Sequence, residues 1–367
     1  MTRVALDARA LTQGRGCARL LRHILPGLTT VEREYQGVIL TTEEGKRSLD
    51  SCPGEILIVP KMSNTVWEQV GLPWYSRKLG AKANYAQTAC APLWGPPTVL
   101  HFIDDPRAAA SRGATAASPR EHVRRLSQDL TVSGGLRRAA LVATCTNAIE
   151  DGLRERFGSI LPPVSVVPLG VDMEIFYPDP IGPQEDTVFH LGSSEPRDAT
   201  TMLVRAYAEA LRMAPDLPDL VIAGNLGNQS ELVIDVIRES GIKSRVSLLG
   251  WISDEELRRA YTRTALCVQP ARYEGFGLQP LEAIACGAPL IIVAEPSVEE
   301  VIGQAGVVVR DPAPTPLATA IARLWRDKDA RQRLRSIGPK RASEFPWSRT
   351  VEGISDLLHK LVTTESP

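Results

Sequence analysis

The chain has 367 residues, which exceeds one ordinary domain and suffices for two domains that each bury a core. Its 42 lysine and arginine residues nearly balance its 43 aspartate and glutamate residues, so the net charge of −1 excludes a global field that would recruit nucleic acid or an acidic membrane. No apolar run approaches the roughly 18 residues that span a bilayer, and a strand pattern begins directly after Met1, where a signal peptide would lie. The six cysteines show no Cys-x-x-Cys spacing. We therefore expect a cytoplasmic protein with reduced cysteines and no transmembrane segment.

The first half of the chain alternates apolar segments with helical or loop segments. Strands are predicted over residues 4–6, 37–40, 56–59, 99–101 and 141–145, and helices over 17–28 and 120–130. Such alternation is typical of a doubly wound α/β domain. Six prolines lie between Pro162 and Pro183, where helical periodicity is weak, and this segment is the predicted interdomain linker.

The second half of the chain repeats the alternation of strands and helices. Strands are predicted over residues 187–191, 220–223, 245–249, 265–269 and 290–293, and helices over 200–213, 230–240, 280–286, 317–325, 330–337 and 348–361. The predicted organisation is a first Rossmann-like domain over residues 1–170, a linker over 171–186, a second Rossmann-like domain over 187–345 and a terminal helix over 346–367. The fold class is therefore α/β.

Two glutamates, Glu274 and Glu282, frame a Gly-x-Gly turn between a predicted strand and a predicted helix. Gly277 permits backbone conformations that other residues avoid. Pro280 suits the first turn of a helix, because its missing N–H would have no intrahelical partner there. Gly287 is the expected C-terminal cap. The segment predicts a strand-loop-helix-strand unit of a parallel sheet.

This unit has the chemistry of a ligand site. In parallel sheets ligands bind outside the carboxyl ends of the strands, and free N–H groups at a helix start attract anions. The backbone amides of Phe276, Gly277 and Leu278 are placed to meet a phosphate or sugar oxygen. Glu282 could accept hydrogen bonds from a ribose diol and Glu274 from a sugar ring, which suggests a nucleotide-sugar. The alternative is that both glutamates merely favour the helix N-terminus electrostatically.

Three further segments contain groups suited to the same ligand. Gly14-Arg-Gly16 follows a strand and either lets the backbone approach a diphosphate or forms a plain tight turn. His101 ends an apolar strand shortly before Asp104, where an imidazole serves either catalysis or structure. Arg197 follows the first strand of the second domain, where a guanidinium can clamp a diphosphate. The adjacent Asp198 either brings a negative charge to that site or pairs with Arg197.

The sequence predicts no metal site. The one Asp-x-Asp, Asp327-Lys-Asp329, lies in a charged turn between two predicted helices, where solvated surface is expected. No Gly-x-Ser-x-Gly, Walker loop or His-Glu-x-x-His is present, which removes the motifs of an esterase, a P-loop ATPase and a zinc protease.

Together these segments resemble the retaining glycosyltransferases of family 4, which have the GT-B fold of two Rossmann-like domains facing a central cleft. The resemblance covers essentially the whole chain and is strongest over residues 14–16, 101–104, 168–172, 192–197, 250–257 and 270–287. The opening of the chain and Trp67-Glu-Gln69 are most similar to the bacterial mannosyltransferase-like branch. The resemblance implies an N-terminal acceptor domain, a C-terminal donor domain and a last helix that returns to the N-terminal domain.

The resemblance also implies a role for each matching residue. Glu274 and His101 would act at the donor sugar as the catalytic pair. The donor-binding residues would be Glu282 at the ribose, Arg197 and Gly16 at the diphosphate, Phe276, Gly277 and Leu278 at phosphate or sugar oxygens, and Gly250 with Tyr261 beside the base. No metal and no cofactor other than the nucleotide-sugar is implied. The family usually has lysine directly after the arginine, where this chain has Asp198.

The expected activity is retaining transfer of a hexose-type sugar from a GDP-, UDP- or dTDP-linked donor. The acceptor would be a hydroxyl of a glycan, a lipid-linked saccharide or a natural product. Two other functions stay open: a non-catalytic GT-B partner or scaffold, which Asp198 motivates, and a GT-B hydrolase, epimerase or phosphorylase. We expect no nucleic-acid partner, whereas a peripheral membrane contact and the oligomeric state stay open.

Overall fold

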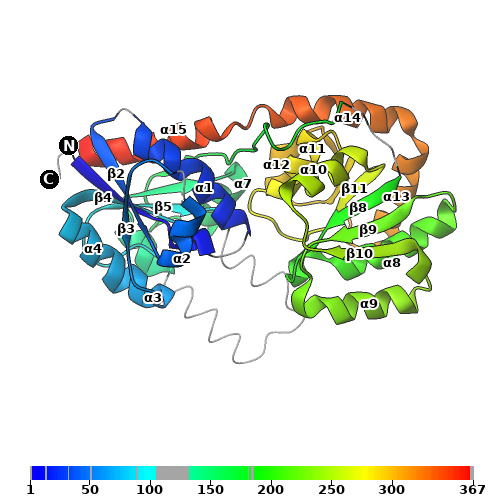
Figure 1. Ribbon diagram of the computed structural model, residues 1–367, viewed down its shortest axis with the longest axis horizontal. Coiled ribbons are helices and arrows are strands. Elements are labelled where there is room, and N and C mark those ends of the chain that lie inside the picture. The colour runs from blue at the N-terminus through cyan, green and yellow to red at the C-terminus, as the bar shows by residue number, and fades with distance from the viewer. Residues whose placement is uncertain are drawn as a thin grey trace. The chain divides into compact units, whose positions relative to one another are not determined.

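The computed structural model describes residues 2–12, 15–31, 33–49, 52–87, 90–104, 132–180, 182 and 186–363. Their contacts divide them into two compact units (Figure 1). Unit 1 contains the described residues up to Gly170 together with Trp347–Thr363, and unit 2 contains those from Val171 to Pro346. The chain therefore passes between the units at Gly170 and again at Pro346.

Unit 1 is built on a sheet of seven parallel strands among its described residues. The strands are β1 (Thr2–Asp7), β2 (Tyr35–Thr41), β3 (Glu55–Ile58), β4 (Ala81–Ala86), β5 (Thr98–Phe102), β6 (Leu141–Thr144) and β7 (Val164–Val166). Their order is β3-β2-β1-β4-β5-β6-β7, and each neighbouring pair is parallel. The chain therefore reverses its direction of winding between β1 and β4.

Two strands of this sheet, β4 and β7, are missing from the sequence prediction. β4 has no β-branched residue in Ala81-Lys-Ala-Asn-Tyr-Ala86, although all of its residues except Lys82 are buried. β7 has three residues inside the proline-rich segment that we predicted as linker. Pairing with neighbouring strands, rather than local composition, determines both elements.

The helices of unit 1 begin and end close to the predicted ones where both exist. They include α1 (Arg15–Thr30), α2 (Glu43–Lys46), α3 (Asn64–Val66), α4 (Leu72–Leu79), α7 (Asn147–Phe157) and α15 (Trp347–Thr363), with 3-10 turns η1 (Arg9–Thr12) and η2 (Arg47–Leu49) and the π-helical η3 (Trp67–Gly71). The helix predicted over 120–130 lies outside the described residues.

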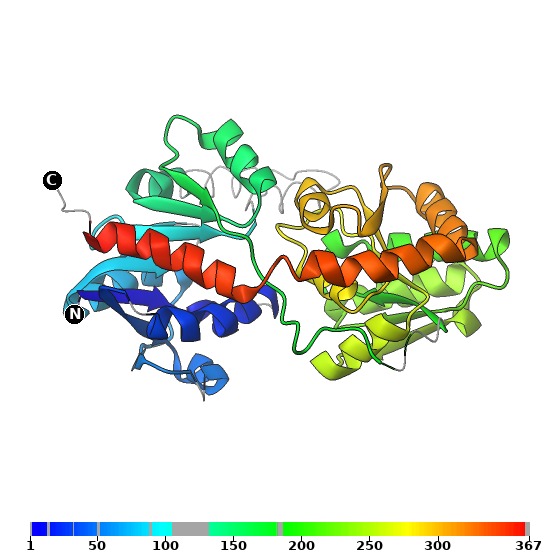
Figure 2. The same ribbon diagram turned by 90° about the horizontal axis from the view of Figure 1, so that it is seen from above.

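The last helix, α15, packs in unit 1, as the resemblance implied. Figure 2 shows it lying along this unit beside α1. The Trp347 indole stacks on the His23 ring of α1 with centroids 4.7 Å apart. The Tyr35 hydroxyl donates to Ser355 Oγ at 2.9 Å. The chain thus closes unit 1 with its C-terminal segment.

Unit 2 is built on a second parallel sheet, in the order β10-β9-β8-β11-β12-β13. Its strands are β8 (Thr187–Leu191), β9 (Asp219–Ala223), β10 (Val246–Gly250), β11 (Leu266–Gln269), β12 (Leu290–Val293) and β13 (Gly306–Val309). Its helices are α8 (Thr200–Met213), α9 (Ser230–Glu239), α10 (Asp254–Arg263), α11 (Leu278–Ala285), α12 (Pro296–Ile302), α13 (Pro314–Arg326) and α14 (Lys328–Ala342), with 3-10 turns η4 (Pro196–Asp198), η5 (Gly227–Gln229) and η6 (Lys243–Arg245).

The core of unit 2 lies between its sheet and the helices that cover it. Leu203 of α8, Leu266 of β11 and Ile321 of α13 are completely buried there. Tyr207 of α8 is also completely buried, and its hydroxyl donates to the Pro218 carbonyl at 2.7 Å, so its polar end is satisfied. No helix in the described part of the chain is both long and apolar enough to cross a membrane.

One strained residue precedes α8 and gives a test of the fold. Ala199 has φ of +53°, in the left-handed region that favours glycine. We expect Ala199→Gly to raise the free energy of unfolding by about 0.5–1 kcal/mol, measured by urea unfolding. The matched control is Ala320→Gly within α13, which should lower it by about 1 kcal/mol. A lower stability of both variants would contradict the strain at Ala199.

Candidate active site

The carboxyl edge of the unit 2 sheet has a switch point between β8 and β11. From β8 the chain winds outward through β9 to β10 and then returns to β11 on the other side of β8. The loops that follow β8 and β11 diverge there, which is where ligands bind in open parallel sheets. The first loop contains Arg197 and the second contains Glu274. The topology therefore brings together two predicted site residues that are distant in sequence.

Arg197 lies in η4 and is fastened to the second loop. Its carbonyl oxygen accepts a hydrogen bond from the Arg272 backbone N–H at 2.9 Å. Its guanidinium carbon lies 6.0 Å from the centre of the Tyr273 ring, within reach of a cation–π contact. The Arg197 cation therefore lies beside Tyr273, the residue that precedes Glu274.

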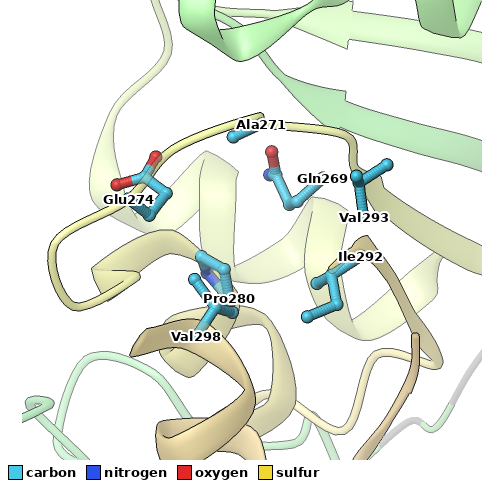
Figure 3. A pocket seen from close by; sticks show the side chains of 7 residues that line it. All are labelled: Gln269, Ala271, Glu274, Pro280, Ile292, Val293 and Val298. Carbon is cyan, nitrogen blue, oxygen red and sulfur yellow. The ribbon is translucent and has the colours of Figure 1, made fainter. Parts of the chain in front are cut away.

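Glu274 lines a hollow at the ends of β11 and β12 (Figure 3). The figure shows the Glu274 carboxylate on the loop at one side and the Gln269 amide near the end of β11, with Pro280, Ile292 and Val298 below them. Gln269 is 5% exposed, and its Nε2 is buried with no hydrogen-bond partner in the part of the chain that the structure describes. The sequence analysis overlooked Gln269, although a polar residue at the end of an apolar strand is a usable signal. A hydroxylated ligand would meet two polar groups in an otherwise apolar hollow.

The helix that follows Glu274, α11, begins two residues earlier than predicted. Gly277 precedes it with φ of +84° and ψ of 55°, a conformation that residues with a Cβ rarely adopt. The Leu281 N–H donates to the Gly277 carbonyl at 3.0 Å. Pro280 is thus the third helical residue, still within the first turn, whose N–H groups have no intrahelical partner. The amide end of α11 suits an anion.

Phe276 and Gly287 fix the two ends of this element. The Phe276 ring is 3% exposed and meets the Phe345 ring edge-on with centroids 5.9 Å apart, so only its backbone is placed to contact a ligand. Gly287 has φ of +75°, and its N–H donates to the Ile284 carbonyl at 3.0 Å. The predicted C-terminal glycine cap is confirmed.

Glu282 is the fifth residue of α11 and is 3% exposed. The predicted helix over 280–286 would place Glu282 in the first helical turn, and this is wrong, because the helix starts at Leu278 rather than Pro280. Glu282 therefore lies in the second turn, on a helix whose residues from Pro280 to Ala285 are all buried. Its contact with a ribose stays a prediction.

Gly250 and Tyr261 occupy different environments. Gly250 ends β10 with φ of +70°, and its carbonyl accepts the Gly224 N–H at 2.6 Å, which aligns the loops after β9 and β10. The Tyr261 ring is completely buried and meets the Phe189 ring of β8 edge-on, with centroids 5.4 Å apart. This position favours a supporting role beneath the loops over direct contact with a base.

Asp198 is turned into unit 2. It is 8% exposed, and its Oδ2 is buried without a hydrogen-bond partner among the described residues. Burial lowers the pKa of the nearby His190, and the Asp198 charge opposes this effect. His190 itself is held by Val268 O at 2.9 Å and Thr200 Oγ1 at 3.0 Å. The charge of Asp198 therefore acts on an imidazole inside the unit.

Gly16 and His101 lie in unit 1. Gly16 is exposed near the start of α1, and His101 is 1% exposed near the end of β5. Burial lowers the pKa of His101 to about 4, so its ring is neutral near pH 7. His101 Nδ1 lies 2.9 Å from the Tyr85 hydroxyl, and Nε2 is buried without a hydrogen-bond partner among the described residues. When Tyr85 donates to Nδ1, the proton of His101 lies on Nε2, where it can be donated to a sugar oxygen.

Comparison with known proteins agrees with this arrangement. The family described as "Glycosyl transferases group 1" matches residues 174–341. A D-inositol 3-phosphate glycosyltransferase of Frankia alni is 30% identical over 287 residues, which cover 72% of this chain and 69% of that protein. The chain belongs to the group 1 glycosyltransferases.

Further similarities to this glycosyltransferase are more distant. O-antigen chain mannosyltransferase B of Escherichia coli is 29% identical over 159 residues, which cover 43% of this chain and 42% of that protein. Sucrose-phosphate synthase from Thermosynechococcus elongatus has a TM-score of 0.78 at 17% identity, with all of both chains covered. HepE of Anabaena, solved with UDP and glucose, has a TM-score of 0.75 at 17% identity, covering 98% of this chain and 99% of that one. The predicted GT-B fold class is confirmed.

A cluster of acids in unit 1 of the glycosyltransferase escaped the sequence analysis. Asp7 ends β1 at the switch point between β1 and β4, and its Oδ2 accepts the Trp67 Nε1–H at 2.9 Å. Burial raises the pKa of Asp7. The next residue after Trp67, Glu68, has its pKa raised to about 7, first by burial and then by repulsion from Asp7. The Trp67-Glu-Gln69 motif was recognised in the sequence, but its pairing with Asp7, sixty positions earlier in the chain, depends on the fold.

The raised pKa of Glu68 predicts a pH-dependent change in stability. Glu68 titrates near 4.5 in the unfolded chain and near 7 in the folded protein, so stability falls as the pH rises through this window. We expect Glu68→Gln to raise the free energy of unfolding by about 2 kcal/mol at pH 8, after allowance for partial exposure, and to leave it unchanged at pH 4. Urea unfolding at both pH values measures this, with the exposed Glu155→Gln as control. A gain independent of pH would contradict the assignment.

Proposed function

We propose that this protein transfers a hexose-type sugar, with retention of anomeric configuration, from a nucleoside-diphosphate-sugar to a hydroxyl. One observation supports this most: Arg197 and Glu274 flank the switch point of the donor-domain sheet, beside the amide end of α11. A cation, a helix N-terminus and a carboxylate in one place suit a diphosphate joined to a sugar. The names of the relatives support the same class, since one is an inositol phosphate glycosyltransferase and another a mannosyltransferase.

The proposed donor site assigns each group a part. Arg197 pairs with the diphosphate, and the N–H groups at the start of α11 bind phosphate or sugar oxygens. Glu274 and Gln269, which line the hollow of Figure 3, each bind a hydroxyl of the donor sugar. Glu282 binds the ribose, and Gly250 borders the base. For unit 1, the resemblance to family 4 gives Gly16 a role at the phosphates and the neutral His101 a role as a hydrogen-bond donor to the sugar. The solved complexes of HepE with UDP and with UDP-glucose make UDP the first nucleotide to test.

The proposed reaction is a front-face displacement, the mechanism that the resemblance to family 4 implies. The acceptor oxygen bonds to the anomeric carbon as the bond to the diphosphate breaks, and the departing diphosphate receives the acceptor proton. The protein stabilises the developing charge and orients the two substrates. We further propose that no metal is required, because Arg197 and the α11 amides supply the positive potential.

Asp198 is compatible with this mechanism because of its burial. A carboxylate exposed beside the diphosphate would oppose the leaving group, whereas this one is 8% exposed and lies near His190. The scaffold alternative depends on Asp198 and predicts that no nucleotide binds.

Calorimetric titration tests the proposal directly. The purified protein is titrated with UDP, GDP, dTDP and ADP and with their sugar conjugates, in the presence of EDTA. Saturable binding of one nucleotide is expected, and it names the donor class for acceptor screens. Donor turnover without acceptor would favour the hydrolase alternative, binding that requires a divalent metal would contradict metal independence, and no binding at all would favour the scaffold.

We also propose a cytoplasmic location, consistent with four of the six cysteines being buried.

A further inference from the structure

Unit 1 presents an exposed apolar surface on α3, η3, α4 and the loop before β5. Val66, Val70 and Trp74 are 47%, 55% and 48% exposed, and Leu93 and Trp94 are 60% and 38% exposed. We call these five residues the apolar patch. Large side chains of this kind are individually common on surfaces, but a contiguous group marks an interaction site.

Three members of the apolar patch share one helical face. Val66, Val70 and Trp74 are spaced four residues apart along the continuous segment Asn64–Leu79, which Figure 1 shows along one flank of unit 1. Side chains at this spacing lie above one another. The opposite face is buried, since Trp67, Leu72 and Ser76 are at most 1% exposed. The segment is therefore amphipathic, with an apolar outer face that is about half exposed.

The other two members are fixed beside this face by Gln69. Gln69 Oε1 accepts the Leu93 backbone N–H at 3.1 Å, and the Gln69 carbonyl accepts the Trp94 Nε1–H at 2.9 Å. Gly95 packs so closely on Pro73 that an added Cβ would lie 2.9 Å from the Pro73 Cβ. The apolar patch is thus one surface held by hydrogen bonds and packing.

The segment that forms the apolar patch is basic, although the whole chain has a net charge of −1. Residues 61–97 contain one acid, Glu68, and four bases, Lys61, Arg77, Lys78 and Lys82. The difference of four bases and one acid leaves a local charge of +3. Lys78 Nζ lies 5.2 Å from the centre of the Trp74 ring, so cationic and aromatic groups are interleaved.

An open hollow adjoins the apolar patch at the end of α4. Its volume is about 400 Å³, and Arg77, Lys82 and Trp94 line it together with Pro96. Two cations beside an indole suit a phosphate group at the boundary of an apolar phase, where tryptophan is enriched.

We propose that this surface docks unit 1 onto a bilayer that contains anionic lipid. Trp74 and Trp94 lie at the level of the head groups, Val66, Val70 and Leu93 contact the acyl boundary, and the cations pair with lipid phosphates. A protein partner fits less well, because lysine is depleted in protein interfaces. Nucleic acid fits less well, because it offers no apolar phase for Val66, Val70 and Leu93. The proposal is independent of the donor site.

Vesicle co-sedimentation tests this proposal. The full chain is mixed with vesicles of phosphatidylcholine, or of phosphatidylcholine and phosphatidylglycerol in equal parts, and we expect salt-sensitive binding to the second kind. The triple variant Arg77→Gln, Lys78→Gln, Lys82→Gln should bind about a hundredfold more weakly, because each cation near an anionic surface contributes about 1 kcal/mol. Trp74→Ala should also weaken binding and leave nucleotide affinity unchanged.

Matched controls lie in unit 2. Trp251 is 72% exposed, and Trp251→Ala should bind vesicles as the parent does. The exposed cations Arg212, Arg323 and Lys328, replaced together by glutamine, control for net charge. Melting temperatures confirm that each variant is folded. The proposal is overturned if the parent does not sediment with anionic vesicles, if both triple variants lose binding equally, or if a duplex DNA binds unit 1 as tightly as the vesicles do.

Discussion

Replacement of Glu274 by alanine is expected to lower the rate of sugar transfer by at least about a hundredfold and to leave nucleotide affinity nearly unchanged. Glu274 lines the hollow beside Gln269 and lies on the loop that is fastened to Arg197, and we propose that its carboxylate contacts the sugar rather than the base. Initial rates with the donor identified by calorimetry measure the first effect, and titration with the free nucleoside diphosphate measures the second. The loss should appear in kcat rather than in the donor KM.

Two further variants make this result interpretable. Glu274→Gln keeps the shape and removes the charge, so a loss equal to that of Glu274→Ala would assign the effect to the carboxylate charge. Glu299→Ala removes an acid of α12 that pairs with Arg310 at 2.7 Å, and it should leave transfer unchanged. If Glu274→Ala is as active as the parent, Glu274 is not a site residue, even if nucleotide binding is established.

The second large effect is expected at Glu282, where alanine should weaken nucleotide binding by about a hundredfold. Hydrogen bonds to a charged group contribute about 1.5–3 kcal/mol each, and a ribose diol can donate two to one carboxylate. Titration calorimetry with nucleoside diphosphate measures the change. A deoxyribose analogue lacking the bound hydroxyl should show a much smaller difference between the parent and the variant.

Burial of Glu282 requires a second variant, because alanine also leaves a cavity in α11. Glu282 is 3% exposed, so Glu282→Gln, which preserves volume, separates ligand binding from packing. We expect Glu282→Gln to weaken binding with a smaller change in melting temperature than the alanine variant. If the glutamine variant binds as tightly as the parent does, the role of Glu282 is structural.

The strand-loop-helix element around Glu274 was predictable because its signals are local. Gly277, Pro280 and Gly287 each restrict the backbone at their own position, so the order of strand, loop, helix and cap could be inferred without any distant contact. The start of α11 was misplaced by two residues. The prediction began the helix at Pro280, because proline suits the first turn, and neither Leu278 nor Gln279 has a local feature that marks a helix start. β4 and β13 were overlooked for a different reason. Their residues become strands through pairing with β1, β5 and β12.

The sequence by itself determined that this protein has two Rossmann-like halves and that Glu274 follows a strand at a glycine turn, and these features depend on periodicity and on backbone restrictions within a few residues. That it is a glycosyltransferase was implied only by its resemblance to family 4. Only the tertiary structure decided that Asp198 is turned inward near His190, that Tyr261 lies in the core against Phe189, and that Asp7 meets Trp67. Burial and the pKa values of side chains depend on which distant segments pack around them, and strand order in the two sheets sets that packing.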